Sequence, residues 1–429
     1  MSRRRTRPAA ASLSAPERQA RADAAQSRAA IEAAIQRVFA PHLAGGHGAR
    51  FVGAWRKTLR MLRPLGAVSQ GNSVRVLTDG DEVFEAAWAA IAAAKTSVHL
   101  STYILEADRV GERTLLELER AAGRGCRVLL VLDAFGSHRV SGERLARVRK
   151  AGAMVIAFNP IVRWRAPFSR LVRYHRKILV VDRRLAFCGG MNVAEEYAGA
   201  RHGTGLFRDT QVALEGPCAR DLAELLERDA SGDGTLEHRA HASGAAPSGS
   251  LVQILESHVR RHRRAIQKAL RVTLGRAQER CYLCSPYFVP PARLKSALTH
   301  AARRGVDVRV LTAGRSDVPL VRLASQHLHG RLLRAGVRIF ELEERVLHAK
   351  TVTVDGVYAS VGSFNLDYWS DRRNLEVSVT ALDRGAACAL EQQFLRDLEG
   401  AREVRLEHWM KRSWPRRCAG WLAYQLFRL

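Results

Sequence analysis

Two stretches of the sequence decide the fold, YHRKILVVD at residues 174–182 and LHAKTVTVD at residues 347–355. In each stretch, a histidine and a lysine two positions apart precede four β-branched or apolar residues and then an aspartate. Side chains at positions i and i+2 of an extended strand point to the same face. Each stretch therefore predicts a buried strand that presents one imidazole and one ammonium group to a common surface and ends at its aspartate. The residues concerned are His175, Lys177 and Asp182 in the first stretch and His348, Lys350 and Asp355 in the second.

A short turn follows each stretch at the same distance, GGMN at residues 189–192 and GSFN at residues 362–365. The separation from histidine to asparagine is identical in the two copies, so a chance match is not a serious explanation. Glycine in such a turn lets the backbone approach a ligand closely. These turns add Gly190, Asn192, Ser363 and Asn365 to the candidate site.

The surrounding sequence is also duplicated. The helix-turn-strand pattern of residues 121–128 recurs at residues 301–308, and strands alternate with helices on both sides of each copy. Such alternation predicts an α/β fold with mixed sheets. A duplication predicts two α/β/α sandwich halves, related by a pseudo-twofold axis, with the active site at their interface. In the first half we expect strands at residues 74–77, 98–105 and 128–132, and helices at residues 82–94 and 113–122.

Composition divides the chain into six segments. A Gly-, Ser- and Ala-rich stretch separates the halves, and an apolar stripe opposite basic residues at positions 50–63 predicts an amphipathic helix, which either packs on the protein or lies on a membrane. The segments are a basic mobile arm with an Ala-rich helix (1–45), the basic amphipathic segment (46–72), the first half (73–230), a linker (231–250), the second half (251–400) and a basic aromatic tail (401–429).

The charge of the chain points to an anionic partner. Its 429 residues include 69 Lys and Arg against 42 Asp and Glu, a net charge of +27. Nucleic acid or an acidic lipid surface fits this excess, and a generally basic proteome would also produce it. The C-x-x-C at residues 281–284 has no second pair, so buried strand thiols are expected rather than a zinc site. Neither a signal peptide nor an apolar stretch of about 18 residues is present, which favours a cytoplasmic protein without a membrane span.

Two histidines, two lysines and two asparagines on one surface suit a phosphodiester. Lysine and asparagine side chains can hold the nonbridging oxygens and stabilise transition-state charge. One neutral histidine can attack phosphorus to form a phosphohistidine, while the other protonates the leaving alcohol and deprotonates the incoming one. The lysines supply the positive charge in this scheme, so neither a metal nor another cofactor is expected.

The doubled H-x-K-x4-D pattern, with its downstream Gly-(Gly/Ser)-x-Asn, resembles the phospholipase D superfamily. Flanking sequences such as FRD at 207–209, SPYFVP at 285–290 and NLE at 374–376 are similar to those of bacterial cardiolipin synthases. The likeness extends over roughly residues 72–394. Many cardiolipin synthases with this pattern begin with two membrane-spanning helices, whereas this chain has no such stretches; it resembles a shorter, peripheral type, which leaves the donor lipid open.

The resemblance implies roles for particular residues. His175 would be the nucleophile and His348 the general acid and base, although the internal symmetry leaves the two assignments interchangeable. Asp209 and Glu376 would bind a catalytic imidazole and set its tautomer, as the third member of a triad does. The remaining expectations are that Asp182 and Asp355 are structural, and that Tyr103 and Tyr287 either line the pocket or pack in the core.

The resemblance implies a phosphatidyltransferase that makes cardiolipin from phosphatidylglycerol and releases glycerol. A hydrolytic phospholipase D, and less strongly a nuclease of the same superfamily, are the alternatives. We expect a peripheral enzyme on the inner cell membrane, where aromatic and basic residues at 163–173 and in the tail meet anionic phospholipid. The tail could equally be a helix packed on the domain. Phospholipids are the expected partners and nucleic acid is not; the oligomeric state stays open.

Overall fold

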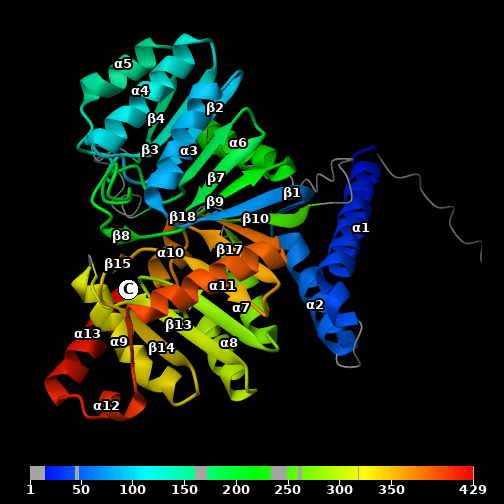
Figure 1. Ribbon diagram of the computed structural model, residues 1–429, viewed down its shortest axis with the longest axis vertical. Helices are drawn as coiled ribbons and strands as arrows, with labels where there is room; N and C mark the ends of the chain where they lie inside the picture. Colours follow the sequence, from blue (N-terminus) through cyan, green and yellow to red (C-terminus); the bar gives the residue numbers. More distant parts are fainter. Residues whose placement is uncertain are drawn as a thin grey trace, which may run out of the picture.

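The computed structural model describes residues 15–43, 48–159, 172–232, 249–258, 263–316 and 318–428. Within these ranges the chain forms two α/β halves that face each other (Figure 1). The predicted basic arm at the N-terminus, most of the linker and most of the aromatic-basic segment at 163–173 lie outside the described residues.

The first half is built on a seven-stranded mixed sheet in the order β1-β9-β7-β6-β2-β3-β4. β2, β3 and β4 are parallel, and the remaining neighbours pair antiparallel. The strands are β1 (Ala67–Leu77), β2 (Ser97–Thr102), β3 (Arg127–Asp133), β4 (Met154–Phe158), β6 (Ile178–Val181), β7 (Leu185–Gly189) and β9 (Gln211–Glu215).

The second half repeats this sheet with the same order and the same directions, β10-β18-β17-β16-β12-β13-β14. The predicted duplication and the two-half α/β architecture are therefore confirmed. The strands are β10 (Ser250–His258), β12 (Arg280–Cys284), β13 (Asp307–Ala313), β14 (Arg338–Leu342), β16 (Thr351–Val354), β17 (Tyr358–Gly362) and β18 (Asn374–Leu382). A further strand, β19 (Ala401–Glu403), pairs with β14 inside the segment predicted as tail.

Strand residues alternate between two cores, as the period of two requires. In β3, Val128 and Leu130 face helices α3 (Gly80–Ala93), α4 (Arg109–Gly123) and α5 (Gly142–Lys150). Leu129 and Val131 face the opposite way, toward α6 (Pro217–Ser231) and toward strands of the second half. In the second half, α7 (Ala265–Arg276), α8 (Ala292–Arg303) and α9 (Pro319–Leu333) cover one face of the sheet, and α11 (Arg384–Glu399) packs on the other.

The halves share one apolar core as well as one strand pair. β1 and β10 pair antiparallel, with Ala67 opposite Ile254. Buried side chains of α6 and the first sheet contact buried residues of β17 and β18, such as Val361 and Val377. Burial of this kind contributes about 25 cal/mol per Å² of apolar surface, so the two halves fix each other's position.

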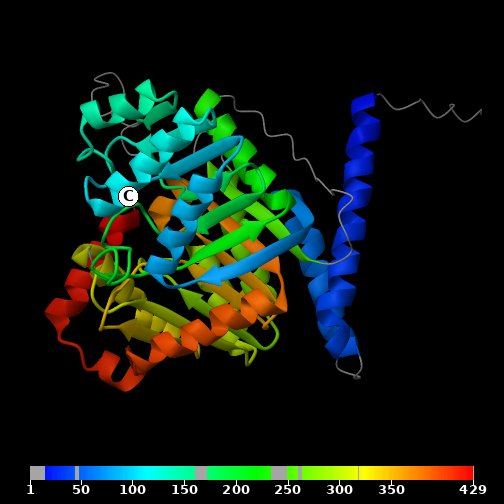
Figure 2. The same ribbon diagram turned by 45° about the horizontal axis from the view of Figure 1, so that its top comes forward.

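The amphipathic segment at the N-terminus packs on the protein. α2 (Gly48–Leu62) follows α1 (Ala15–Leu43), and its apolar side chains Phe51, Trp55 and Leu59 are at most 7% exposed. They join the core of the second half, although in sequence the segment precedes the first half. Figures 1 and 2 show both helices along one side of the molecule. Of the two alternatives for this stripe, docking is the one observed.

The C-terminal tail forms α12 (Leu406–Met410) and α13 (Trp414–Arg428). Ala423 and Tyr424 are buried against α9, whereas Trp414 is 74% exposed. One face of α13 therefore packs on the domain, as one of the two alternatives held, and the other faces solvent. Within the described ranges, no helix has the length and apolarity needed to cross a bilayer. The C-x-x-C thiols at residues 281–284 are buried in β12, as expected.

Candidate active site

Each motif histidine follows a very short strand that pairs with the other half. β5 (Arg173–Tyr174) runs parallel to the start of β18, and the backbone N–H of His175 donates to the carbonyl of Leu375 at 3.0 Å. β15 (Val346–Leu347) runs parallel to β8 (Phe207–Arg208), and the N–H of His348 donates to the carbonyl of Arg208 at 2.8 Å. The duplicated motifs thus come together through two equivalent cross-half pairings.

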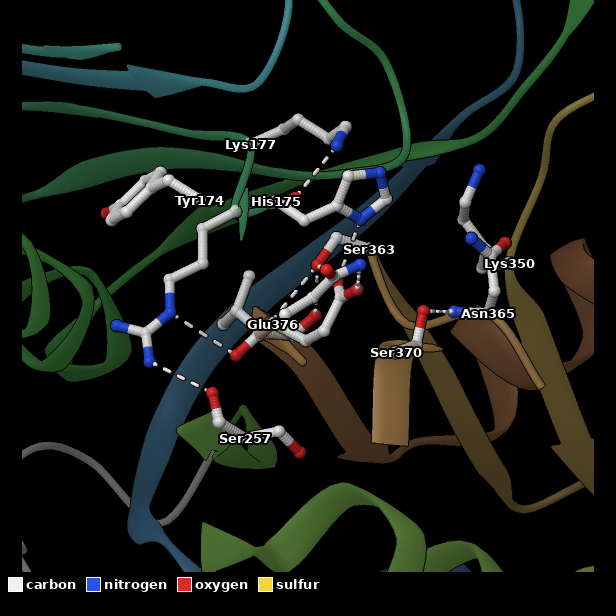
Figure 3. A network of polar contacts seen from close by, with 12 residues as sticks. Tyr174, His175, Lys177, Ser257, Lys350, Ser363, Asn365, Ser370 and Glu376 are labelled. Atoms are coloured by element: carbon white, nitrogen blue, oxygen red, sulfur yellow. Dashed lines mark hydrogen bonds and ion pairs between the residues drawn. The ribbon is translucent and has the colours of Figure 1, made fainter. Parts of the chain in front are cut away.

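These pairings bring a carboxylate of the opposite half to each imidazole. Nδ1 of His175 lies 2.9 Å from Oε2 of Glu376, and Nδ1 of His348 lies 2.6 Å from Oδ2 of Asp209 (Figure 3 shows the first pair). Both carboxylates are at most 1% exposed. A carboxylate acceptor places the proton of a neutral imidazole on Nδ1 and leaves the lone pair on Nε2 free to react. The sequence predicted these two acids as orienting groups without assigning either to a histidine.

The two lysines border the same space. Nζ of Lys177 donates to the carbonyl oxygen of His175 at 2.8 Å, and Lys350 donates to the carbonyl of His348. Figure 3 shows Lys177 and Lys350 on either side of the His175 ring. Burial lowers the pKa of Lys177 to about 7, and the positive charge of Lys350 adds to the effect. The second half therefore acts electrostatically on the first.

Both imidazoles are neutral at neutral pH. Burial lowers the pKa of His175, and the charges of Lys177 and Lys350 lower it further against the opposing effect of Glu376. Burial and Lys350 lower the pKa of His348 to about 4. Because a lysine from each half acts on the histidine of the other, the two motifs share one electrostatic environment. Neutral imidazoles carry the free lone pair that nucleophilic attack and proton abstraction require.

The two asparagines differ in their surroundings. Oδ1 of Asn192 accepts from the N–H of Ile104 at 3.1 Å, and Nδ2 donates to the hydroxyl of Tyr197 at 2.7 Å. That hydroxyl lies 3.5 Å from Nε2 of His348, the reactive side of the ring. Oδ1 of Asn365 is buried and has no hydrogen-bond partner among the described residues. Sequence reasoning missed Tyr197, although its place five residues after Asn192 in the same turn is a signal that it shares the site.

The equivalent positions Gly190 and Ser363 support the two carboxylates. A Cβ atom at Gly190 would lie 2.3 Å from Oδ1 of Asp209, so the missing side chain makes room for that carboxylate. The Ser363 hydroxyl instead donates to Oε2 of Glu376 and accepts from the N–H of Val377. Both predicted residues therefore stand behind the histidines, where they position the orienting acids.

The motif aspartates lie at the strand ends, away from the imidazoles. Asp182 accepts hydrogen bonds from the N–H groups of residues 95–97, and Asp355 accepts them from those of residues 278–280. Burial alone would raise the pKa of Asp182, but the backbone amides lower it to about 2. Asp355 also accepts from the indole of Trp55 at 3.1 Å. This is the structural geometry expected for the two aspartates, so of the six motif residues only four reach the reacting surface.

Arg176 is a further residue that the motif analysis passed over. It stands between His175 and Lys177 in the sequence, and its side chain is fully buried. Its guanidinium lies 2.5 Å from Asp229 on α6 and 3.0 Å from Glu256 on β10. The ion pairs join the two halves directly behind the first motif, because Asp229 belongs to the first half and Glu256 to the second. The alternation of strand faces is the signal for this role, because the residue between His and Lys must point into the core.

The two candidate tyrosines, Tyr103 and Tyr287, lie in different surroundings. The ring of Tyr103 meets the His175 ring edge to face, with centroids 5.2 Å apart, and lies 5.3 Å from Nζ of Lys177. Tyr103 therefore borders the site. Tyr287 packs against the apolar core of the second half.

Both halves of this chain are similar to known proteins. A family model described as the phospholipase D-like domain of cardiolipin synthase matches residues 87–215 and again residues 270–398. A cardiolipin synthase of Listeria monocytogenes is 33% identical over 355 residues, which cover 81% of this chain and 73% of that protein. Cardiolipin synthase A of Pseudomonas entomophila is 35% identical over 352 residues, 81% of this chain and 74% of that protein.

Solved structures agree on the fold. Phosphatidylserine synthase from Haemophilus influenzae superposes with a TM-score of 0.70 at 14% identity, over 87% of this chain and 99% of that one. Polyphosphate kinase from Porphyromonas gingivalis gives a TM-score of 0.55 at 15% identity, over 78% of this chain and 49% of that one. With both copies of the domain matched and both sets of site residues in place, the chain belongs to the cardiolipin synthase family of phospholipase D-like enzymes.

Proposed function

We propose that this enzyme is a phosphatidyltransferase that converts two molecules of phosphatidylglycerol into cardiolipin and glycerol. One observation supports it above the others: two neutral imidazoles, each held at Nδ1 by a carboxylate of the opposite half, share a site with two lysines. Group transfer needs this pairing, because one histidine carries the phosphatidyl group while the other handles protons. The cardiolipin synthases among its relatives support cardiolipin as the product.

In the first step, Nε2 of His175 attacks the phosphorus of one phosphatidylglycerol. The bond from phosphorus to the glycerol oxygen breaks, and His348 donates a proton to that oxygen, so glycerol leaves and a phosphatidyl-histidine remains. His348 is neutral in the free enzyme, with a pKa of about 4. An anionic phosphodiester beside the ring favours its protonated form and raises that pKa as the substrate binds.

In the second step, His348 accepts a proton from the hydroxyl group of a second phosphatidylglycerol. The oxygen attacks phosphorus, the bond to Nε2 of His175 breaks, and cardiolipin leaves. Lys177 and Lys350 stabilise the negative charge on the nonbridging oxygens in both transition states. Since these ammonium groups supply the positive charge, we propose that the reaction is independent of metal ions.

The assignment of His175 as nucleophile rests on the family resemblance, and the pseudo-twofold symmetry makes it testable. Rapid quenching with denaturant at mildly alkaline pH, where a phosphorus–nitrogen bond survives, followed by mass spectrometry of peptides, should find the phosphatidyl adduct on His175. An adduct on His348 would exchange the two roles. The same preparation treated with EDTA should keep its full rate, and loss of activity on chelation would exclude the metal-free scheme.

A product assay tests the function itself. Purified enzyme incubated with phosphatidylglycerol in mixed detergent micelles should give cardiolipin and free glycerol. Phosphatidic acid as the sole product would identify a hydrolase, and cleavage of single-stranded DNA without lipid turnover would identify a nuclease. Because the substrate is a bilayer lipid, we also propose that the enzyme works as a peripheral protein on the cytoplasmic surface of the cell membrane.

A further inference from the structure

An arginine-rich hollow lies outside the active site, between α9, α12 and α13. Its volume is about 460 Å³, within the range of small-ligand sites. Three tryptophans share its wall with the arginines, and none of the described residues that line it is acidic. The residues are Arg331, Arg334, Arg412, Arg416 and Arg417, with Trp409, Trp414 and Trp421.

The arginines of this hollow carry more positive charge than the nearby acid Glu341 can balance, although Glu341 attracts Arg412. In the part of the chain that the structure describes, none of the five arginines forms an ion pair. Arg412 donates to Oε1 of Gln326 at 3.0 Å and stacks over the Trp409 ring at 3.9 Å. The nearby acid Glu341 is already paired with Arg402 at 2.6 Å and Arg322 at 3.8 Å. Guanidinium groups that line one hollow repel one another, so an anion with several oxygens would stabilise them.

The exposed tryptophans indicate where that anion resides. Trp414 and Trp421 are 74% and 48% exposed and lie two turns apart, on one flank of α13. Leu422 and Leu426 on the same helix are more than half exposed. Indole rings beside arginines suit the headgroup layer of a membrane, where the ring is half-buried and the cation meets lipid phosphate. A site for a soluble anion has no need of exposed apolar side chains.

We propose that this hollow binds the phosphate headgroup of an anionic phospholipid in the bilayer and docks the enzyme on the membrane. The inference rests on the proposed function, because it assumes that the enzyme works at a lipid surface. α13 links the hollow to the active site. The ring centroids of its Phe427 and of Trp369 on α10 (Tyr368–Arg372) are 6.4 Å apart, and α10 follows the site residue Asn365 in the chain. Docking through α13 therefore holds the reacting surface near the lipid.

Vesicle binding tests the proposal. The double variant Arg331→Gln/Arg417→Gln changes two exposed side chains of the hollow. Arg147→Gln/Lys150→Gln removes the same charge from exposed positions of α5, at the far end of the molecule (Figure 1). In sedimentation with phosphatidylglycerol–phosphatidylcholine vesicles, the first variant should bind about 25-fold more weakly, because each basic residue near the surface gives roughly a fivefold gain. The second should bind within about twofold of wild type, as a distant charge does beyond a Debye length.

Other outcomes would overturn the inference. Equal losses in the two variants would mean that net charge alone attracts the protein. If millimolar inorganic phosphate released the protein from vesicles as effectively as added free vesicles do, the hollow would be a site for a soluble anion. If the hollow variant lost only its binding to single-stranded DNA, the hollow would be a nucleic-acid site. The micelle assay of the wild-type enzyme separates the two hypotheses. Cardiolipin formation together with unchanged vesicle binding by the hollow variant would refute the docking site alone.

Discussion

The two histidines occupy equivalent positions but are supported differently. His175 depends on a glutamate that a serine hydroxyl also binds, and buried ion pairs lie behind its strand. His348 depends on a shorter aspartate packed against glycine, with a tyrosine hydroxyl near its Nε2. The duplicated motif gives the site its symmetry, and the different residues around the two rings give each its own surroundings. Two copies of one motif can therefore take different roles in one reaction.

Replacement of either histidine should lower kcat more than any other proposed substitution, and the two losses should differ because the two residues have different roles in the proposed reaction. His175→Ala removes the proposed nucleophile and should lower kcat by a factor of about 10⁴ or more, because no covalent intermediate forms. His348→Ala removes proton transfer, worth about 10² to 10⁴. Initial rates of cardiolipin formation check both values, with circular dichroism as the control for folding. A greater loss in His348→Ala, or an adduct that accumulates only in His175→Ala, would reverse the roles.

The buried ion pairs of Arg176 should contribute strongly to the unfolding free energy, and the second half has no counterpart of them at Ala349. Arg176→Met removes the guanidinium that pairs with the buried acids Asp229 and Glu256, which costs about 3–5 kcal/mol of unfolding free energy. Ala349, its counterpart in the second motif, makes no such ion pair. Urea denaturation measures the change. The exposed pair of Arg75 and Glu82 gives the control, since Arg75→Met should cost less than about 1 kcal/mol. Equal costs would mean that the buried network contributes no more than a surface one.

Substitutions of Gly190 and Ser363, which support the two carboxylates, should lower kcat by different factors. Gly190→Ala places a Cβ atom 2.3 Å from the Asp209 carboxylate, so the acid must move away from His348. We expect a loss of about 100-fold in kcat with a smaller change in KM, because orientation of the base is lost. Ser363→Ala removes one hydrogen bond to Glu376 and should cost about tenfold. Similar small losses in both variants would mean that the carboxylates tolerate displacement.

Much of this architecture could be predicted from the sequence. Spacing within each motif gave the strands, and repetition gave the two halves and their meeting point. The pairing of each histidine with the acid of the other half could not be predicted, because Glu376 and His175 are 201 residues apart and local patterns do not encode register between halves. The strand expected over residues 98–105 ends at Thr102 because the N–H of Ile104 binds the side chain of Asn192 instead of a neighbouring strand.

Each amphipathic pattern left two alternatives open, a helix packed on the protein or a helix on a membrane. The stripe of α2 and the aromatic residues of α13 both recur at helical spacings, and both have basic residues beside them. In the structure Trp55 is 3% exposed and Trp414 is 74% exposed. Periodicity reports that one face of a helix is apolar, but not what covers that face. Only the packing partners, Asp355 and Tyr358 for Trp55, decide the matter.

The pH dependence of activity tests whether protonation of one residue of the first half, Lys177, limits the reaction. Lys177 must be charged to bind the phosphodiester, and burial lowers its pKa to about 7. A lysine loses its charge as the pH rises through its pKa, so kcat/KM should fall above about pH 7 by up to tenfold per unit. Lys177→Arg keeps the charge at every accessible pH. In this variant the alkaline fall should move upward by at least one unit even though the maximal rate is lower.

The conservative replacement Lys150→Arg on the surface of α5 provides the control for that profile. It should leave the alkaline fall where wild type has it. If Lys177→Arg also leaves it unchanged, another group limits activity, and the charge of the first lysine is not what the rise in pH removes. If the fall moves, the first half supplies the titrating cation. The electrostatic coupling of Lys177 to Lys350 then predicts that Lys350→Met, by removing the neighbouring positive charge, raises the pKa of Lys177 and shifts the same limb upward.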